Sequence, residues 1–295
     1  MVKVRPPRER RPRVRVRRRL SGLSVNRMIP NVLTLLALCA GMTAVRFAIA
    51  GDFQAACYAI IAAGVFDGLD GRMARLLKAT SRFGAELDSL ADFVSFGVAP
   101  AAVLYLWTMH SLESIGWAIV LFYAVCCALR LARFNSELSV ERPRYAANFF
   151  SGAPAPAGAG LLIWPMFISF EWGDWLTRSP YLNGVWISVV ALMMVSTVPT
   201  VSLKPIRIPQ QWVVPSLLGI GVLAGFFMTA PWPTLTLIGV VYTASIPLTI
   251  RAYYRAKAAA EADAKPEPAE LAAPLAPPPP RMPLGDGPAA NEWRH

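Results

Sequence analysis

Apolar runs of about twenty residues, separated by short polar connections, dominate this 295-residue chain. A helix needs about 20 consecutive apolar residues to cross the hydrocarbon core of a bilayer. Eight runs are long enough, and we expect each of them to form a transmembrane helix. They cover residues 29–50, 54–77, 85–108, 114–134, 152–171, 184–203, 212–230 and 234–251.

Lysine and arginine alternate between the connections that join these runs. They gather after every second run and are almost absent from the connections between. The basic connections contain Lys78 and Arg82, Arg142 and Arg144, Lys204 and Arg207, and finally Arg251, Arg255 and Lys257. Because positively charged loops stay on the cytoplasmic side of a membrane, this order predicts an all-α, polytopic membrane protein with both termini in the cytoplasm.

The composition agrees with this prediction and divides the chain into three parts. A content of 55% hydrophobic and 16% charged residues is too apolar for a soluble globular protein. Residues 1–28 are strongly basic, and we interpret them as a disordered cytoplasmic arm that contacts anionic lipid rather than nucleic acid. Residues 29–251 form the transmembrane domain, and the Ala- and Pro-rich residues 252–295 are expected to be a disordered cytoplasmic tail.

Four carboxylates interrupt the second and third apolar runs: Asp67, Asp70, Asp88 and Asp92. A carboxylate at membrane depth costs about 2.5–3.5 kcal/mol on insertion scales unless it is paired or bound to a cation. Counted from the polar turn around Lys78 at 1.5 Å per residue, each acid lies about 10–16 Å deep. An antiparallel pair of helices therefore brings all four to a similar depth, where they predict a metal site.

Small and basic residues accompany these acids. Gly71 and Gly84 let a bulky group approach the helix backbone, and Arg75, on the same face as Asp67, is placed to hold a phosphate. Metal-binding carboxylates beside a phosphate-binding arginine indicate substitution at phosphorus. Two other interpretations stay open at this point: a buried salt-bridge network with the neighbouring arginines, and a divalent-metal transporter.

The spacing of these residues resembles the signature of a known family. The pattern Asp67-x2-Asp70-Gly71-x2-Ala74-Arg75-x8-Gly84-x3-Asp88-x3-Asp92 is similar to that of the CDP-alcohol phosphatidyltransferases, which are membrane enzymes. Three further segments, residues 29–34, 95–100 and 129–135, resemble the bacterial members that use serine as the acceptor alcohol. The resemblance makes residues 29–251 a catalytic domain.

The resemblance also implies a role for each residue of the signature. Two divalent cations, Mg²⁺ or Mn²⁺, would bridge the pyrophosphate of a CDP-lipid. Asp67 and Asp88 would touch both ions, Asp70 the first and Asp92 the second, and Asp92 would be the general base that deprotonates the acceptor hydroxyl. The residues expected to bind CDP-diacylglycerol are Asn31, Thr34, Gly71, Arg75 and Ser81.

The fourth apolar run offers residues for the acceptor. Arg130 and Arg133 lie at i and i+3 near its cytoplasmic end, a spacing that suits the binding of one anion. We expect these two arginines, together with Asn135 and Ser95, to bind L-serine.

These expectations describe one reaction at the cytoplasmic face of a bacterial inner membrane. The phosphatidyl group of CDP-diacylglycerol passes directly to the hydroxyl of L-serine, which gives phosphatidylserine and CMP. The same chemistry with glycerol 3-phosphate, inositol phosphate or choline as acceptor stays open. Small residues at 153–160 and at Gly221 and Gly225 suit close helix packing, within the chain or in a homodimer.

Overall fold

The computed structural model describes residues 25–137, 149–196, 199–201 and 209–263, and apart from one small sheet this part of the chain is helical. Most of the predicted basic arm and most of the predicted tail lie outside the described residues. In chain order the elements are α1 (Val25–Ile49), α2 (Phe53–Leu76), α3 (Arg82–Asp92), the π-helix η1 (Phe93–Val98), α4 (Ala99–Trp107), the 3-10 turn η2 (Met109–Leu112), α5 (Glu113–Glu137), β1 (Phe149–Ser151), α6 (Ala155–Trp172), α7 (Pro180–Val195), β2 (Pro199–Val201), the 3-10 turn η4 (Gln210–Trp212), α8 (Val213–Thr229) and α9 (Pro231–Asp263).

Each of the eight predicted runs coincides with a helix or a continuous series of helices, but several boundaries were wrong. Helix α1 begins at Val25 rather than at residue 29, and α7 at Pro180 rather than at residue 184. The run predicted to end at residue 203 ends as α7 at Val195, and Pro199 begins β2, which pairs antiparallel with β1. Proline has no amide hydrogen and restricts the residue before it, which opposes helix continuation there. The last run continues as α9 to Asp263 rather than ending at 251, because residues 256–263 are rich in helix-forming alanine, lysine and glutamate.

Five helical segments are long and apolar enough to cross a membrane: Met28–Ile49, Arg82–Trp107, Met109–Ser136, Gln210–Thr229 and Pro231–Ala258. Helix α2 falls outside this set because its aspartates lower its hydropathy, and the apolar helix α7 is shorter. Many large apolar side chains are exposed on the outer surface, and α8 has no buried residue at all. Such a surface fits lipid rather than water, and the fold is that of a polytopic membrane protein.

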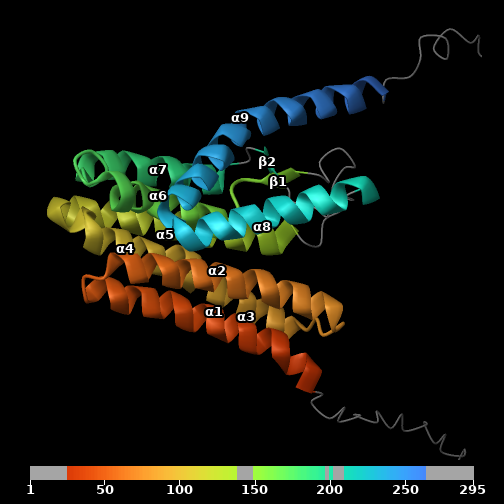
Figure 1. Ribbon diagram of the computed structural model, residues 1–295, viewed down its shortest axis with the longest axis horizontal. Coiled ribbons are helices and arrows are strands. Elements are labelled where there is room, and N and C mark those ends of the chain that lie inside the picture. Colours follow the sequence, from red (N-terminus) through yellow and green to blue (C-terminus); the bar gives the residue numbers. More distant parts are fainter. Residues whose placement is uncertain (1–24, 138–148, 197–198, 202–208, 264–295) are drawn as a thin grey trace, which may run out of the picture.

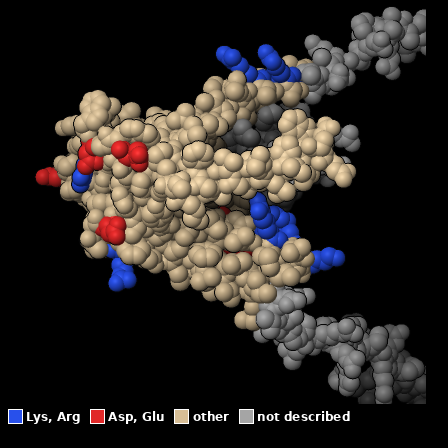
Figure 2. Space-filling view, viewed as in Figure 1, with Lys and Arg blue, Asp and Glu red and all other residues tan. Residues whose placement is uncertain are grey.

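The helices pack as a bundle in which α1, α2 and α3 lie along one side and α6, α7 and α9 along the other (Figure 1). The beginning of α1 and the end of α9 lie at the same end of the long axis. Figure 2 shows most lysine and arginine side chains near that end, and the surface carboxylates gathered mainly at the opposite one. The connections rich in lysine and arginine thus lie at one end of the bundle, and the other end carries most of the surface carboxylates.

Helices α1 and α5 both pack against the π-helix η1. The Tyr123 hydroxyl of α5, which is fully buried, donates to the Phe96 carbonyl at 2.9 Å. A Cβ atom added to Gly97 would lie 3.2 Å from the Cys127 sulfur, so this glycine lets α5 approach. The wide turn thus fixes α5 against the chain directly after Asp92.

Helix α1 closes on the other side of η1. The Ser95 hydroxyl, which is fully buried, donates to the Ala37 carbonyl at 3.1 Å. A Cβ atom at Gly41 would lie 2.9 Å from the Ser95 Cα atom, closer than real side chains come to a backbone. Glycine is therefore required at position 41 for this helix contact.

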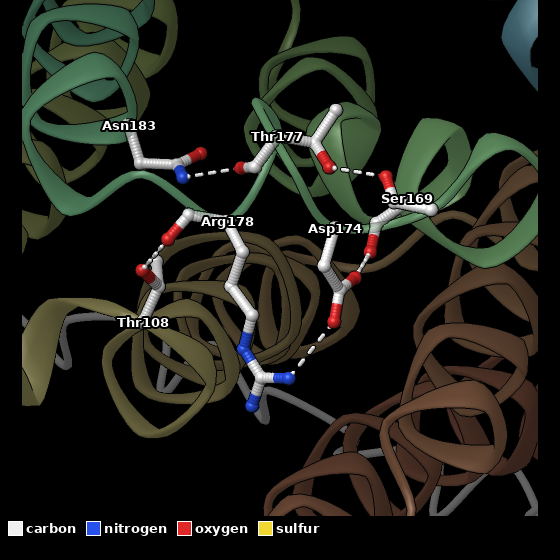
Figure 3. Close-up of polar contacts among 7 residues, drawn as sticks. Thr108, Ser169, Asp174, Thr177, Arg178 and Asn183 are labelled. Carbon is white, nitrogen blue, oxygen red and sulfur yellow. Dashed lines mark hydrogen bonds and ion pairs between the residues drawn. The ribbon is translucent and has the colours of Figure 1, made fainter.

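A polar network joins the connections at the opposite end of the bundle (Figure 3). The Thr108 hydroxyl after α4 donates to the Arg178 carbonyl at 2.9 Å, and the Arg178 guanidinium pairs with Asp174 at 3.0 Å. Asn183 of α7 donates to the Thr177 carbonyl at 2.7 Å. The hydrogen bond from Ser169, and then Arg178, hold the pKa of the Asp174 carboxyl below its usual range. The network fixes the α6–α7 connection far from the carboxylates of α2 and α3.

Replacing Gly41 by alanine tests the contact between α1 and η1. The added methyl group meets the backbone of Ser95, so we expect Gly41→Ala to destabilise the protein by about 1–3 kcal/mol. Thermal unfolding in detergent measures the effect. Gly221→Ala is the control, since a Cβ atom there meets nothing within 4 Å. Equal unfolding midpoints for the two variants would contradict the packing described.

Candidate active site

Three carboxylates from two helices converge inside the bundle. Asp67 and Asp70 of α2 and Asp88 of α3 each offer one oxygen, and these oxygens all lie within 4.8 Å of one another. No lysine or arginine among the described residues makes an ion pair with them, so the salt-bridge network considered from the sequence is not formed there. Oxygen donors of this kind suit hard divalent cations such as Mg²⁺, Mn²⁺ or Ca²⁺. The three residues could therefore hold a metal ion.

Asp92 extends this cluster toward α5. Its carboxyl group makes a hydrogen-bonding contact with that of Asp67, and it lies one helical turn beyond Asp88 on α3. The π-helix starts at the next residue, so the end of α3 is held by the packing of η1 against α1 and α5. The antiparallel arrangement predicted from depth is confirmed, with all four acids on facing segments of α2 and α3.

Helix α1 supplies the partner of the most buried acid. Thr34 donates its hydroxyl hydrogen to an oxygen of Asp70 at 2.6 Å, and both side chains are almost completely buried. The same hydroxyl lies 3.1 Å from the Pro30 carbonyl. Thr34 thus fixes the direction in which the Asp70 carboxylate points.

Gly84 is the point at which α1, α3 and the turn before α3 come closest. A Cβ atom there would lie 3.0 Å from the Asn31 side-chain oxygen and 3.1 Å from the Ser81 hydroxyl. Ser81 is the N-cap of α3 and accepts a hydrogen bond from the Gly84 amide at 3.0 Å. The predicted close approach to the Gly84 backbone is therefore made by the protein's own side chains.

One cavity of about 380 Å³ opens beside these groups, between α1, α2 and α3. All five residues predicted to bind CDP-diacylglycerol line this cavity: Asn31, Thr34, Gly71, Arg75 and Ser81. Asp70 and Asp88 form part of its wall, and Arg75 is exposed to it. A Cβ atom at Gly71 would meet nothing within 4 Å, so packing within the protein does not demand glycine there. The space beside Gly71 belongs to the cavity.

The sequence reasoning did not assign cavity positions to a few further residues. These are Pro30, Ala79, Thr80 and Ala85, and Ala74 was assigned only as part of the signature. A sequence signal existed for them, because small side chains recur next to Gly71, Ser81 and Gly84. Small side chains indicate room for a ligand. Whether a given residue faces the cavity depends on how its helix is rotated, and spacing along the chain does not determine that rotation.

Arg130 of α5 faces the other side of the carboxylates. Its charge acts on Asp67 and Asp92, although it makes no hydrogen bond or ion pair with any described residue. It shares one face of α5 with Tyr123 and Cys127, the residues that pack on η1. The guanidinium lies 5.7 Å from the centre of the Phe134 ring. A largely buried cation is thus held next to the acids with its hydrogen-bond donors available.

The other residues predicted to bind serine make contacts elsewhere. Arg133 donates to the Val195 carbonyl at 2.6 Å, where α7 ends and its last carbonyls lack helical partners. Asn135 donates to the Ser89 hydroxyl at 2.9 Å and so ties α5 to α3. Ser95 belongs to the α1 contact described above. No described contact brings these three residues to the carboxylate cluster.

Comparisons with known proteins agree with this geometry. Residues 27–198 match the profile of the CDP-alcohol phosphatidyltransferases, and residues 211–247 match that of a second group, CDP-alcohol phosphatidyltransferase 2. The chain belongs to the CDP-alcohol phosphatidyltransferase family. This family is metal-dependent, which gives the cluster of Asp67, Asp70 and Asp88 its chemical context.

Relatives with an assigned activity share most of the chain. A CDP-diacylglycerol–serine O-phosphatidyltransferase of Mycobacterium tuberculosis is 40% identical over 225 residues, which cover 76% of this chain and 78% of the relative. The enzyme of the same name from Mycobacterium leprae is 39% identical over 224 residues, 76% and 74% of the two chains. That of Helicobacter pylori is 34% identical over 182 residues, 61% and 74%.

Metal binding at the cluster can be measured without any substrate. We expect Mg²⁺ or Mn²⁺ to raise the midpoint temperature of thermal unfolding. The free energy of unfolding should rise by about 2.7 kcal/mol when the metal concentration is a hundred times the dissociation constant. Asp88→Asn should lose this stabilisation and should be no less stable without metal, because it relieves repulsion between carboxylates. Glu86→Gln, an exposed carboxylate on the same helix, is the control and should keep the response. A metal response that survives in Asp88→Asn would contradict the site.

Proposed function

We propose that this chain is a CDP-diacylglycerol–serine O-phosphatidyltransferase. It transfers the phosphatidyl group of CDP-diacylglycerol to the hydroxyl of L-serine and releases CMP. The proposal rests on three features that lie next to one another. These are the carboxylate cluster, the cavity beside Gly71, and Arg130, which interacts with the acids but does not line that cavity. The relatives that bear this name support the choice of substrates.

The cavity between α1, α2 and α3 holds the CDP group. The open space beside Gly71 lets a phosphate lie against the α2 backbone, and the Arg75 guanidinium is placed to hydrogen-bond its oxygens. The single hydroxyl hydrogen of Thr34 is already donated to Asp70, so toward a nucleotide Thr34 can only accept a hydrogen bond. Asn31 and Ser81 complete the polar part of the wall.

Asp67, Asp70, Asp88 and Asp92 hold the metal, which we propose to be two Mg²⁺ or Mn²⁺ ions. When bound, such ions neutralise charge on the pyrophosphate and on the departing CMP. The hydrogen bond from Thr34 keeps the Asp70 carboxylate aimed into the cluster, while the packing of η1 holds Asp92. The residues of the chain thus set the positions of the donor oxygens before any ligand arrives.

Asp92 serves as the general base. Its carboxyl group contacts that of Asp67 and interacts electrostatically with Arg130, so an acceptor whose carboxylate is bound by Arg130 would present its hydroxyl near Asp92. The hydroxyl proton passes to Asp92 as the serine oxygen bonds to the phosphorus that carries diacylglycerol. The bond from this phosphorus to the CMP oxygen breaks in the same displacement, so no covalent enzyme intermediate forms.

The acceptor is selected by the charge of Arg130. Arg130 recognises an anion, so the phosphate of glycerol 3-phosphate or of inositol phosphate is the alternative to the serine carboxylate, whereas choline offers no anion. A divalent-metal transporter has no use for a nucleotide-sized cavity lined by Gly71 and Arg75 next to the acids.

The charge distribution supports an orientation. Basic side chains gather at the end of the bundle that holds the α2–α3 turn and the end of α9 (Figure 2). By the positive-inside rule we place this end, and the cavity that opens near it, in the cytoplasm of a bacterial cell, with the helices in the inner membrane. A homodimer remains a prediction, for which Gly221 and Gly225 of α8 leave open space on the bundle surface.

The reaction itself is tested by the release of CMP. Membranes containing the protein should release CMP from CDP-diacylglycerol only when L-serine and a divalent metal are both present. Asp92→Asn should lower the rate by at least about 100-fold, since general base catalysis contributes about 10²–10⁴. Release with glycerol 3-phosphate instead of serine would move the assignment to the alternative acceptor, and release without any acceptor would contradict direct displacement.

Two glycines of α2 provide a matched test of the CDP cavity. A Cβ atom meets nothing within 4 Å at either Gly71 or Gly68, but only Gly71 lines the cavity. Gly71→Ala should fold normally and raise the KM for CDP-diacylglycerol about tenfold, a loss of about 1.4 kcal/mol of binding. Gly68→Ala should leave this KM unchanged. The same KM in both variants would place the nucleotide elsewhere.

A further inference from the structure

The last helix, α9, carries a buried hydroxyl with no partner. The Tyr242 hydroxyl and the Thr236 hydroxyl, both on α9, are the buried side-chain polar atoms of the described residues that make no hydrogen bond. Buried polar groups are nearly always hydrogen-bonded in folded proteins, so an unpaired one requires an explanation. For Tyr242 the surroundings offer one.

Tyr242 lines a cavity inside the bundle. This apolar cavity of about 210 Å³ lies between α2, α6 and α9, and Gly64 and Phe96 also line it. Gly64 comes three residues before Asp67, and Phe96 comes four residues after Asp92. Two residues of the cavity wall therefore lie about one helical turn from Asp67 and Asp92 along α2 and η1.

The packing of α9 on α6 places Tyr242 there. Trp164 of α6 donates its indole hydrogen to the Thr236 carbonyl at 3.2 Å and lies directly against the Gly239 backbone, where no side chain would fit. Tyr242 follows Gly239 by three residues and so lies on the same face of α9. Gly239 thus lets α9 pack closely on α6, and Tyr242, one turn later, lines the cavity between them.

Arg130 connects this hydroxyl to the site. Its positive charge acts on Tyr242 as well as on Asp67 and Asp92. Neither Arg130 nor Tyr242 lines the cavity proposed for the CDP group. A cation and an unpaired hydroxyl, from α5 and α9, therefore interact electrostatically outside the cavity proposed for the CDP group.

We infer that Tyr242 is a specificity residue for the acceptor, and that its hydroxyl donates a hydrogen bond to the carboxylate of the amino acid bound by Arg130. A carboxylate has two oxygens and can accept from a guanidinium and a phenol at the same time. The bound amino acid then supplies the partner that the Tyr242 hydroxyl lacks in the free protein. This inference rests on the proposed function, because it concerns the acceptor of that same reaction.

The test compares two hydroxyl deletions on α9. Tyr242→Phe should raise the KM for L-serine about tenfold, the effect of one hydrogen bond to a charged group, and leave kcat and the KM for CDP-diacylglycerol unchanged. Thr236→Val removes the other unpaired hydroxyl and should leave all three constants unchanged. With serinol, which has the hydroxyl and the amine of serine but no carboxylate, Tyr242→Phe and the wild type should react equally.

Thermal unfolding separates this role from a structural one. Tyr242→Phe loses no hydrogen bond within the protein and should keep the wild-type midpoint, whereas Tyr123→Phe loses the bond to the Phe96 carbonyl and should have a lower one. An unchanged KM for serine in Tyr242→Phe, or a lowered midpoint with both KM values raised, overturns the inference. If the wild type itself shows no serine-dependent release of CMP, the proposed function fails and this inference fails with it.

Discussion

The burial of several carboxylates at one depth of a membrane helix bundle is the constraint on which the rest of this structure depends. Each charge costs about 2.5–3.5 kcal/mol at membrane depth on insertion scales, and mutual repulsion adds to this where oxygens of Asp67, Asp70 and Asp88 lie within 4.8 Å. No described lysine or arginine pairs with them. A divalent cation removes both costs at once, which makes the folded site and the metal interdependent.

A metal site needs carboxylates in fixed positions, and the packing of the helices around the acids provides this. Gly41 and Gly97 allow α1 and α5 to pack on the π-helix η1 from two sides, and the Tyr123 hydroxyl donates to the Phe96 carbonyl of η1. The same packing sets Thr34 on Asp70 and Arg130 beside Asp92. One cavity opens beside Gly71, between α1, α2 and α3, and another beside Tyr242, between α2, α6 and α9.

The sequence predicted that Asp67, Asp70 and Asp88 lie together and that one cavity wall includes Gly71 and Arg75, because helical spacing fixes which residues share a face. It did not predict the contacts that Arg133 and Ser95 make. Arg133 shares its spacing with Arg130 but donates to the end of α7, a partner that spacing along α5 cannot reveal. Ser95 lies in a resembling segment, yet its hydroxyl serves the contact with α1. Tyr242 lies on α9, where spacing along the chain predicted no binding residue, and only tertiary packing shows that it lines a cavity inside the bundle.

The claim that metal held by these acids contacts the pyrophosphate of a CDP-lipid is tested most directly by sulfur substitution. A CDP-diacylglycerol analogue with sulfur in place of a non-bridging oxygen on the lipid-bearing phosphorus should react poorly in Mg²⁺, because a hard cation binds sulfur weakly. Replacing Mg²⁺ by the softer Mn²⁺ or Cd²⁺ should restore much of the rate. An equal effect of sulfur in all three metals would contradict a direct metal contact at the reacting phosphorus.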